Sequence, residues 1–282
     1  MSVRDRLEER RELLTPSERR VAEVVLGDPE AVAFGTVAEL ARRAGTGGAT
    51  VVRLAERLGY EGFTGLQSAV RDDFAGRLRL ASQRIRRPAA HDDLASRALA
   101  VEAGNLAATF EHLDRAALRR AVVEISRRRA RVIVLPGGAS VGIARQFCDE
   151  LAMLRAGILL VAGSPVEVAA RSADLASEDV VVAIDLRRYD DALLDAVSMA
   201  AEAGATVIAV TDSVLSPLAA LADATLVAAV EGTGPFDSHI GVLAIGNALV
   251  AGVAARLRHS ATERIDRIEG AWDAVGAVVD HP

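Results

Sequence analysis

Five short apolar runs follow one another in the second half of the chain, with helix-sized segments between them. From residue 131 onward they read RVIVLPG, ILLVAG, DVVVAID, TVIAVTD and ATLVAAV. Each run is rich in β-branched residues and almost continuously apolar, which is typical of strands that are covered on both faces of a parallel sheet. Residues 131–282 are therefore predicted to form an α/β sandwich with a five-stranded parallel sheet.

A different pattern occupies residues 36–60, where two short amphipathic segments are joined by a glycine-containing turn. Leu40 and Ala41 are expected to face inward from the first helix, and Val51 and Leu54 from the second. Gly45 lies at the turn, where a residue that tolerates positive φ is needed. This spacing predicts a helix-turn-helix, a unit whose second helix enters the major groove of DNA.

The predicted second helix carries the residues expected to contact DNA. Thr50 and Arg53 lie early in it and on its outer surfaces, where base edges are reached. Arg57 lies one turn later and is expected to contact phosphate, while Arg42 and Arg43 can contact the DNA backbone from the first helix. A helical hairpin that only packs remains the alternative.

Charge and composition favour a cytoplasmic protein with a basic N-terminal region. The net charge is −6, but residues 1–90 hold 16 Arg and 13 acidic residues, while residues 91–282 hold 17 Arg and 26 acidic residues. A mildly basic head on an acidic body suits DNA binding at one end. The N-terminus lacks the apolar core of a signal peptide, and the apolar run at 241–255 is too short to span a bilayer, so no membrane association is expected.

The N-terminal region resembles a known family. LTPSERRVAEVVLGDPEAVAF, followed by TVAELARRAG and ATVVRLAERLGYEGF, is similar to the N-terminal domain of the RpiR/MurR family of bacterial transcription regulators. The resemblance implies a DNA-binding domain at 1–77, followed by a sugar isomerase (SIS) domain. The arginine-rich stretch around Pro88 is expected to connect the two, which places the linker at 78–97 and the SIS-like domain at 98–282. The resemblance also implies a double-stranded DNA operator and a homodimer or homotetramer. Gly47 and Gly48 depart from the family, which usually has Ser and then an acidic residue there.

In a parallel α/β sheet, ligands bind beyond the carboxyl ends of the strands. The first such loop, at 136–140, has two glycines and then Ser140, which lies where helix amides attract an anion. Thr211 follows the fourth strand and Ser238 precedes the last apolar helix, and both are further candidates for effector binding, with helix capping as the alternative role. By resemblance to the family, the effector is expected to be a small anion such as a phosphosugar.

The loop at 185–190 departs from phosphosugar-binding SIS domains, in which the corresponding loop resembles Ser-x-Ser-Gly-x-Thr. Asp185 and Arg187 replace the serines, Arg188 replaces the glycine and Asp190 replaces the threonine. In one interpretation, Arg187 or Arg188 binds a phosphate or carboxylate. In the other, these arginines pair with Asp185, Asp190 or Asp191 and fill the pocket.

An isomerase is the rival function, because SIS folds also occur in enzymes. It would need a base near a held phosphate, and Glu231 and His239 are the candidates. Neither belongs to a recognisable catalytic motif, so no enzymatic activity is expected. The single cysteine and scattered histidines lack metal-ligand spacing, so neither a metal nor another cofactor is expected. A third possibility is a regulator whose SIS domain only mediates assembly.

Overall fold

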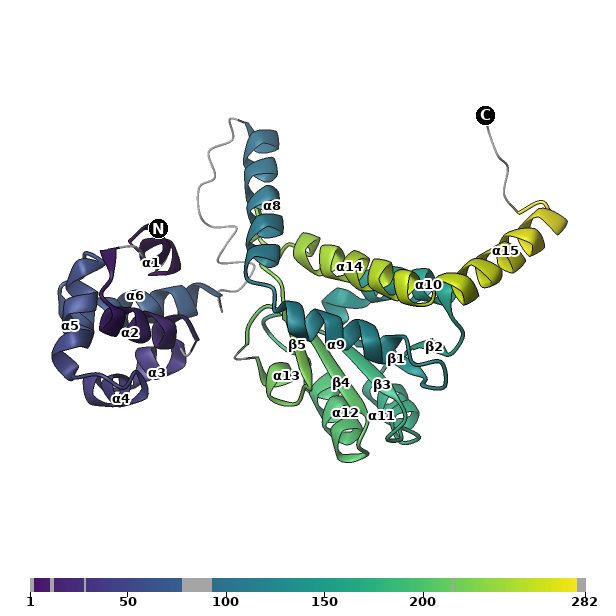
Figure 1. Ribbon diagram of the computed structural model, residues 1–282, viewed down its shortest axis with the longest axis horizontal. Helices are drawn as coiled ribbons and strands as arrows, with labels where there is room; N and C mark the ends of the chain where they lie inside the picture. The colour runs from purple at the N-terminus through teal and green to yellow at the C-terminus, as the bar shows by residue number, and fades with distance from the viewer. Residues whose placement is uncertain (1–2, 11–12, 28, 78–92, 215, 278–282) are drawn as a thin grey trace. The chain divides into compact units, whose positions relative to one another are not determined.

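Figure 1 shows the computed structural model, which describes residues 3–10, 13–27, 29–77, 93–214 and 216–277. The chain divides into two compact units, residues 1–83 and 84–282, and each is described by itself. Most of the predicted linker, residues 78–92, lies outside the described residues. Its last part does not: helix α8 begins at Leu94.

The described part of the N-terminal unit is all-helical and includes the two helices of the predicted helix-turn-helix. Its core is formed by side chains that are fully buried, among them Val21, Leu40, Leu54, Leu58 and Leu66. The described helices are α1 (Val3–Glu9), α2 (Pro16–Gly27), α3 (Pro29–Phe34), α4 (Val37–Arg43), α5 (Gly48–Arg57) and α6 (Gly62–Arg77).

Side-chain caps define where two of these helices begin. Before α2, the Thr15 hydroxyl accepts a hydrogen bond from the Glu18 amide, and the Glu18 carboxylate accepts one from the Thr15 amide at 2.8 Å. Thr36 and Glu39 form the same capping box at α4. Such caps satisfy amides that have no partner within the helix and contribute about 1 kcal/mol each.

The second unit contains the predicted parallel sheet, with strand order β2-β1-β3-β4-β5. In register, Val132 pairs with Ile158 and Val180, and Val180 pairs with Thr206. The strands are β1 (Val132–Pro136), β2 (Ile158–Leu160), β3 (Val180–Ile184), β4 (Thr206–Thr211) and β5 (Ala224–Val227).

Helices cover both faces of the sheet, which confirms the expected α/β sandwich. One face packs against α9, α10 and α14, and the other against α11, α12 and α13 (Figure 1). The bounds are α9 (Arg115–Ile125), α10 (Val141–Leu154), α11 (Pro165–Ser172), α12 (Asp191–Glu202), α13 (Pro217–Ala220) and α14 (Ile240–Arg256).

Two further helices lie at the margins of the sandwich. One of them buries polar side chains and exposes apolar ones. Helix α8 (Leu94–Glu111) buries the polar residues Asn105 and Thr109. Its apolar face, formed by Leu99, Leu106 and Phe110, is exposed, with Leu99 at 71%. Helix α15 (Arg258–Ala274) packs on α10, and its C-terminal half extends away from the sandwich (Figure 1).

Among the helices that the structure describes, none is long and apolar enough by itself to cross a membrane. Only α14 and α15 taken together meet that criterion, and this pair is bent by 104°.

Candidate functional site

Helices α4 and α5 form the predicted helix-turn-helix. Gly45 has φ of +59°, which confirms the positive φ expected at the turn. The Thr46 amide donates to the Ala41 carbonyl at 2.9 Å, and Arg20 of α2 donates to the Ala44 carbonyl at 3.3 Å. These bonds satisfy carbonyls at the end of α4 and fix the angle at which the chain enters α5.

The second helix, α5, begins at Gly48, and its N-cap residue, Gly47, makes no side-chain hydrogen bond. The start of α5 therefore depends on packing of Val51, Leu54 and Ala55 against the rest of the unit, where all three are fully buried.

Four predicted DNA contacts have exposed side chains: Arg42, Arg43, Arg53 and Arg57. Arg42 and Arg43 lie in the last turn of α4, where their charge also favours the negative end of the helix dipole. Arg53 is exposed on α5 and donates to the Thr50 hydroxyl at 3.4 Å.

Thr50 itself was expected on an outer surface of α5, and this placement is wrong. Its exposed fraction is only 7%. Thr50 lies four residues before Leu54, and residues spaced by four lie one above the other on the same helix face. The buried face of α5 therefore includes Thr50, whose hydroxyl positions Arg53.

Arg57 is 49% exposed, but its guanidinium is also paired within the unit. Its Nε lies 3.0 Å from the Glu18 carboxylate, and its Nη1 donates to the Leu13 carbonyl at 2.8 Å. Burial by itself would raise the pKa of Glu18. The hydrogen bonds from Thr15 and the charges of Arg57 and Arg53 outweigh that effect and lower the pKa. Arg57 thus links α5 to the start of α2, and its contact with DNA phosphate stays a prediction.

The second candidate site is at the carboxyl edge, the edge of the sheet where β1, β3, β4 and β5 end. The chain leaves β1 toward β2 on one side, whereas β3 lies on the other side of β1, so the topological switch point is between β1 and β3. Open α/β sheets bind ligands at such a point. The loops after these two strands contain Ser140 and Asp185, which agrees with their selection from the sequence.

Asp185 is buried against the loop after β1. Its carboxylate accepts hydrogen bonds from the Leu186 amide at 2.9 Å and the Asp190 amide at 2.8 Å. It also packs so closely on Gly137 that a Cβ there would lie 2.1 Å from Oδ1. Burial raises the pKa of Asp185 to about 6, helped by the nearby charges of Asp190 and Asp212, and the two amides oppose the rise.

Arg187 forms a buried ion pair at the carboxyl edge. Its Nε and Nη2 both donate to Oδ1 of Asp237, at 2.9 and 2.5 Å, and the two side chains are largely buried. Burial acts to lower the pKa of Arg187, but this ion pair and the other nearby acids raise it. The geometry favours the interpretation in which an arginine fills the pocket. The partner is Asp237, however, and none of Asp185, Asp190 or Asp191.

The rest of the loop after β3 turns into α12. Arg188 has φ of +73° and an exposed side chain. Asp190 is the N-cap of α12, and its carboxylate accepts from the amides of Ala192 and Leu193 at 3.0 and 3.4 Å. Arg188 and Asp190 therefore shape the loop rather than line its interior.

Hydroxyl groups lie at the ends of β1 and β4. Ser140 and Thr211 are fully buried, and within the described part of the chain their hydroxyls have no hydrogen-bond partner of ordinary geometry. The Tyr189 hydroxyl lies near Thr211 and donates to Asp212 at 2.8 Å. Burial and the charge of Asp212 raise the pKa of Tyr189. Buried hydroxyls that lack partners are unusual in folded proteins and are available to a ligand.

Ser238 is hydrogen-bonded to a residue of α8. Its hydroxyl donates to the Glu102 carboxylate and accepts from the Ile240 amide at 3.2 Å, so it joins α8 to the start of α14. The Asn105 side chain pairs with both the amide and the carbonyl of Glu231, at 3.0 and 2.7 Å. These α8 residues were missed by sequence reasoning, because they lie more than a hundred positions from their partners.

The catalytic candidates lie on the loop after β5. Glu231 has an exposed side chain, and its backbone is held by Asn105. His239 precedes α14, and its Nε2 is buried with no hydrogen-bond partner among the described residues. No group of three or more potential metal ligands occurs in the described parts of the chain.

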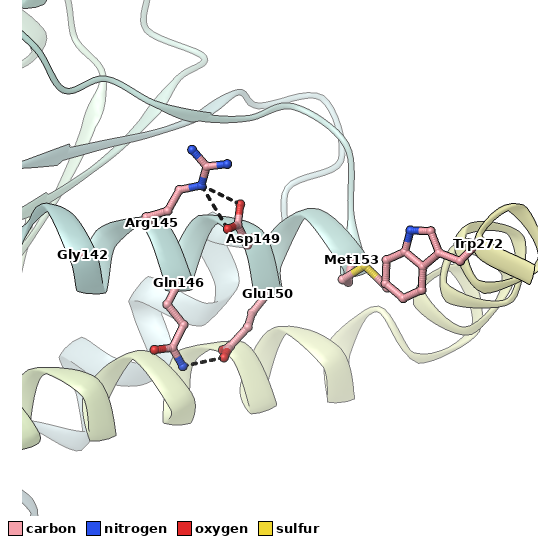
Figure 2. Close-up of a pocket in the computed structure, with 7 residues that line it drawn as sticks. All are labelled: Gly142, Arg145, Gln146, Asp149, Glu150, Met153 and Trp272. Carbon is pink, nitrogen blue, oxygen red and sulfur yellow. Dashed lines mark hydrogen bonds and ion pairs between the residues drawn. The ribbon is translucent and has the colours of Figure 1, made fainter. Parts of the chain in front are cut away.

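A separate open groove runs between α10 and α15 (Figure 2). Its polar side chains pair with one another: Arg145 donates to Asp149 at 3.0 Å, and Gln146 donates to Glu150 at 2.9 Å. Met153 and Trp272 form its apolar end. None of the residues predicted for the effector site lines it.

Comparison with known proteins identifies both units. Residues 1–77 match the helix-turn-helix domain of the rpiR family, and residues 124–252 match the SIS domain. The sugar isomerase domain of the RpiR transcription factor from Sphaerobacter thermophilus is 30% identical, with 63% of this chain and 99% of that domain covered and a TM-score of 0.59. The chain belongs to the RpiR family.

Two other proteins resemble this RpiR-family chain over longer stretches. The Vibrio vulnificus NanR protein complexed with ManNAc-6P shares the fold, with 23% identity, coverage of 99% of this chain and 100% of that one, and a TM-score of 0.60. The bifunctional protein glk of Paraburkholderia xenovorans (strain LB400) is 27% identical over 226 residues. This chain spans only 35% of the length of the latter protein, although 80% of this chain is matched.

Proposed function

We propose that this RpiR-family protein is a transcription regulator that binds a double-stranded DNA operator through residues 1–77. The observation that carries the proposal is the helix-turn-helix geometry of α4 and α5 together with the exposed arginines Arg42, Arg43 and Arg53. Arg53 would contact base edges from α5, and the two arginines of α4 would contact the DNA backbone.

The SIS domain would bind the controlling metabolite at the carboxyl edge, within residues 98–282. The switch point between β1 and β3 supports this position, as does the buried hydroxyl of Ser140, which has no hydrogen-bond partner among the described residues. The ManNAc-6P complex of the NanR protein supports a carbohydrate derivative. An anionic effector would have to displace Asp237 from Arg187. The effector must bind the DNA-competent and DNA-incompetent arrangements unequally in order to regulate.

The regulator would act as a homodimer or a homotetramer. The apolar face of α8 supports this assembly, because Leu99, Leu106 and Phe110 share one helix face and are exposed while the polar face is buried. A second copy of the chain, with the same apolar face, would cover it. Two DNA-binding units in such a dimer would contact half-sites about 34 Å apart.

A helix-turn-helix joined to a SIS domain fits a regulator rather than an isomerase. An isomerase would need a base held next to the substrate's phosphate. Arg187, the buried cation at the carboxyl edge, is paired with Asp237, and Glu231 projects from an exposed position. We therefore do not propose a catalytic role for Glu231 or His239.

The Arg53→Ala variant tests the DNA-binding assignment. The wild-type protein first selects a preferred duplex from a random-sequence library, and fluorescence anisotropy then measures binding of that duplex. A specific base contact is worth about 1–3 kcal/mol, so the affinity of Arg53→Ala should fall roughly 5- to 150-fold. Arg119→Ala removes an equal charge from an exposed position on α9 and serves as the control. Equal affinities for the two variants would contradict the assignment of α5 as the recognition helix.

A further inference from the structure

We propose that the Asp185 carboxylate occupies the anion-binding position of this SIS domain, so that the effector is an uncharged, hydroxyl-rich compound rather than a phosphate ester. The inference rests on the proposed function, in which an effector binds at the carboxyl edge, and it names the chemical class of that effector.

The backbone amides at the start of α12 already have partners within the chain. Free amides at a helix N-terminus form an anion-binding site, and phosphates commonly bind there. In this chain the Asp190 amide donates to Asp185, and the Ala192 and Leu193 amides donate to Asp190. The Leu186 amide, earlier in the same loop, also donates to Asp185. Two internal carboxylates therefore hold the donors that a phosphate would need.

The buried cation of the site is likewise occupied. Both Nε and Nη2 of Arg187 donate to Asp237, and the side chains are 8% and 14% exposed. Separating such a pair would leave a buried carboxylate without its counter-charge, and that is strongly unfavourable. A phosphate that binds Arg187 must therefore break this ion pair. It is then also repelled by the negative charge of the released Asp237.

The charge of the carboxyl edge opposes an anion as well. The loops after β1, β3, β4 and β5 contain five acidic residues, Asp185, Asp190, Asp212, Glu231 and Asp237, against two arginines, Arg187 and Arg188. A phosphate monoester would add a charge of about −1.5 to −2 at neutral pH. Like charges at a partly buried site repel strongly, because water screens them poorly.

Hydroxyl donors suit the same groups. A carboxylate has about four lone-pair positions, and the amides of Leu186 and Asp190 use two of those on Asp185. Ligand hydroxyls can donate to the remaining positions without adding charge. The buried Ser140 hydroxyl, which has no partner in the described structure, can exchange hydrogen bonds with the same ligand, and the buried Thr211 hydroxyl lies next to Tyr189 at the same edge.

Thermal-shift measurements on the full-length protein test the inference. The probes are inorganic phosphate and matched pairs of free sugars and their 6-phosphates, including N-acetylmannosamine and its 6-phosphate, at constant ionic strength. In wild type, each free sugar should stabilise at least as much as its phosphate, and at least one should raise the melting temperature. In Asp185→Ser, the affinity for the phosphorylated member should rise about tenfold, because one anion no longer competes with another.

Asp191→Ser is the matched control. It removes the same charge from an exposed residue in the first turn of α12, which follows the Asp185 loop. Asp185→Asn provides a second test if the serine variant does not fold. A wild-type preference for the phosphorylated members would overturn the inference, and so would an equal gain in Asp191→Ser. Stabilisation by neither member of any pair would overturn the effector class. Operator affinity of the same preparations reports separately on the regulator function.

Discussion

Gly137→Ala directly perturbs the contact between the loop after β1 and Asp185. A Cβ at residue 137 would lie 2.1 Å from Oδ1, 2.3 Å from Cγ and 2.7 Å from Oδ2 of Asp185. Atoms in van der Waals contact are about 3.5–4.0 Å apart, so the whole carboxylate must move by more than an ångström. It cannot do so and keep its hydrogen bonds from the Leu186 and Asp190 amides.

The expected loss of stability follows from these contacts. Hydrogen bonds to a charged group contribute about 1.5–3 kcal/mol, and overpacking a buried site costs about 1–3 kcal/mol. Partial relaxation of the loop reduces the sum, so Gly137→Ala should lower the unfolding free energy by about 3 kcal/mol. For a unit of this size, about 2–4 °C per kcal/mol gives a fall in melting temperature of roughly 6–12 °C.

Scanning calorimetry of four proteins measures the effect and isolates its cause. They are wild type, Gly137→Ala, Asp185→Ala and the double variant. If the clash with Asp185 is the cause, Gly137→Ala should cost less than about 1 kcal/mol in the Asp185→Ala background. Gly138→Ala is the control, since an added Cβ there meets no described atom within 4 Å. Additive effects, or an equal loss in Gly138→Ala, would refute the proposed packing of Asp185 on Gly137.

Two further predictions concern assembly and pH. Leu99→Glu places a charge on the apolar face of α8 and should shift the protein toward monomer in analytical ultracentrifugation. Val166→Glu, at an exposed position of α11, should not. Equal masses for the two variants would argue against α8 as the interface. Asp185 has a pKa of about 6 in the folded protein against an ordinary value of 3.8, so the folded state binds more protons between these values. Stability should therefore fall by up to about 3 kcal/mol as pH rises from about 4 to 6. In Asp185→Asn, urea titrations should show that this fall is reduced, and an unchanged pH profile would exclude Asp185 as its source.

Much of the fold was predictable because its signals are local. The capping box of Thr15 and Glu18 and the turn at Gly45 each depend on residues within a few positions of one another. The strands were predictable for a related reason, since a strand covered on both faces must be apolar at every position. The error at Thr50 has a local origin too: its polar side chain suggested exposure, whereas its spacing from Leu54 required burial.

The candidate site was predictable only in part, because its chemistry depends on pairs that are distant in sequence. The parallel sheet was enough to locate Ser140, Asp185 and Thr211 at one edge. Nothing near Ser238 in sequence indicated that Glu102 would accept its hydrogen bond, since the two are 136 positions apart. The partner of an effector-site side chain could therefore not be read from its own loop.

Arg187 shows why this matters for function. An arginine in an anion-binding loop suggests a ligand contact, yet the same side chain also suits an internal ion pair, and the residue type does not distinguish the two. Its partner, Asp237, is 50 positions away. A buried arginine without a counter-charge is strongly unfavourable, so in the absence of ligand it must pair with any acid that the fold brings close. The substitutions at Asp185 and Arg187 therefore act together: each supplies a charge that the fold itself satisfies, and a ligand that adds hydroxyls disturbs fewer of these bonds than a ligand that adds an anion.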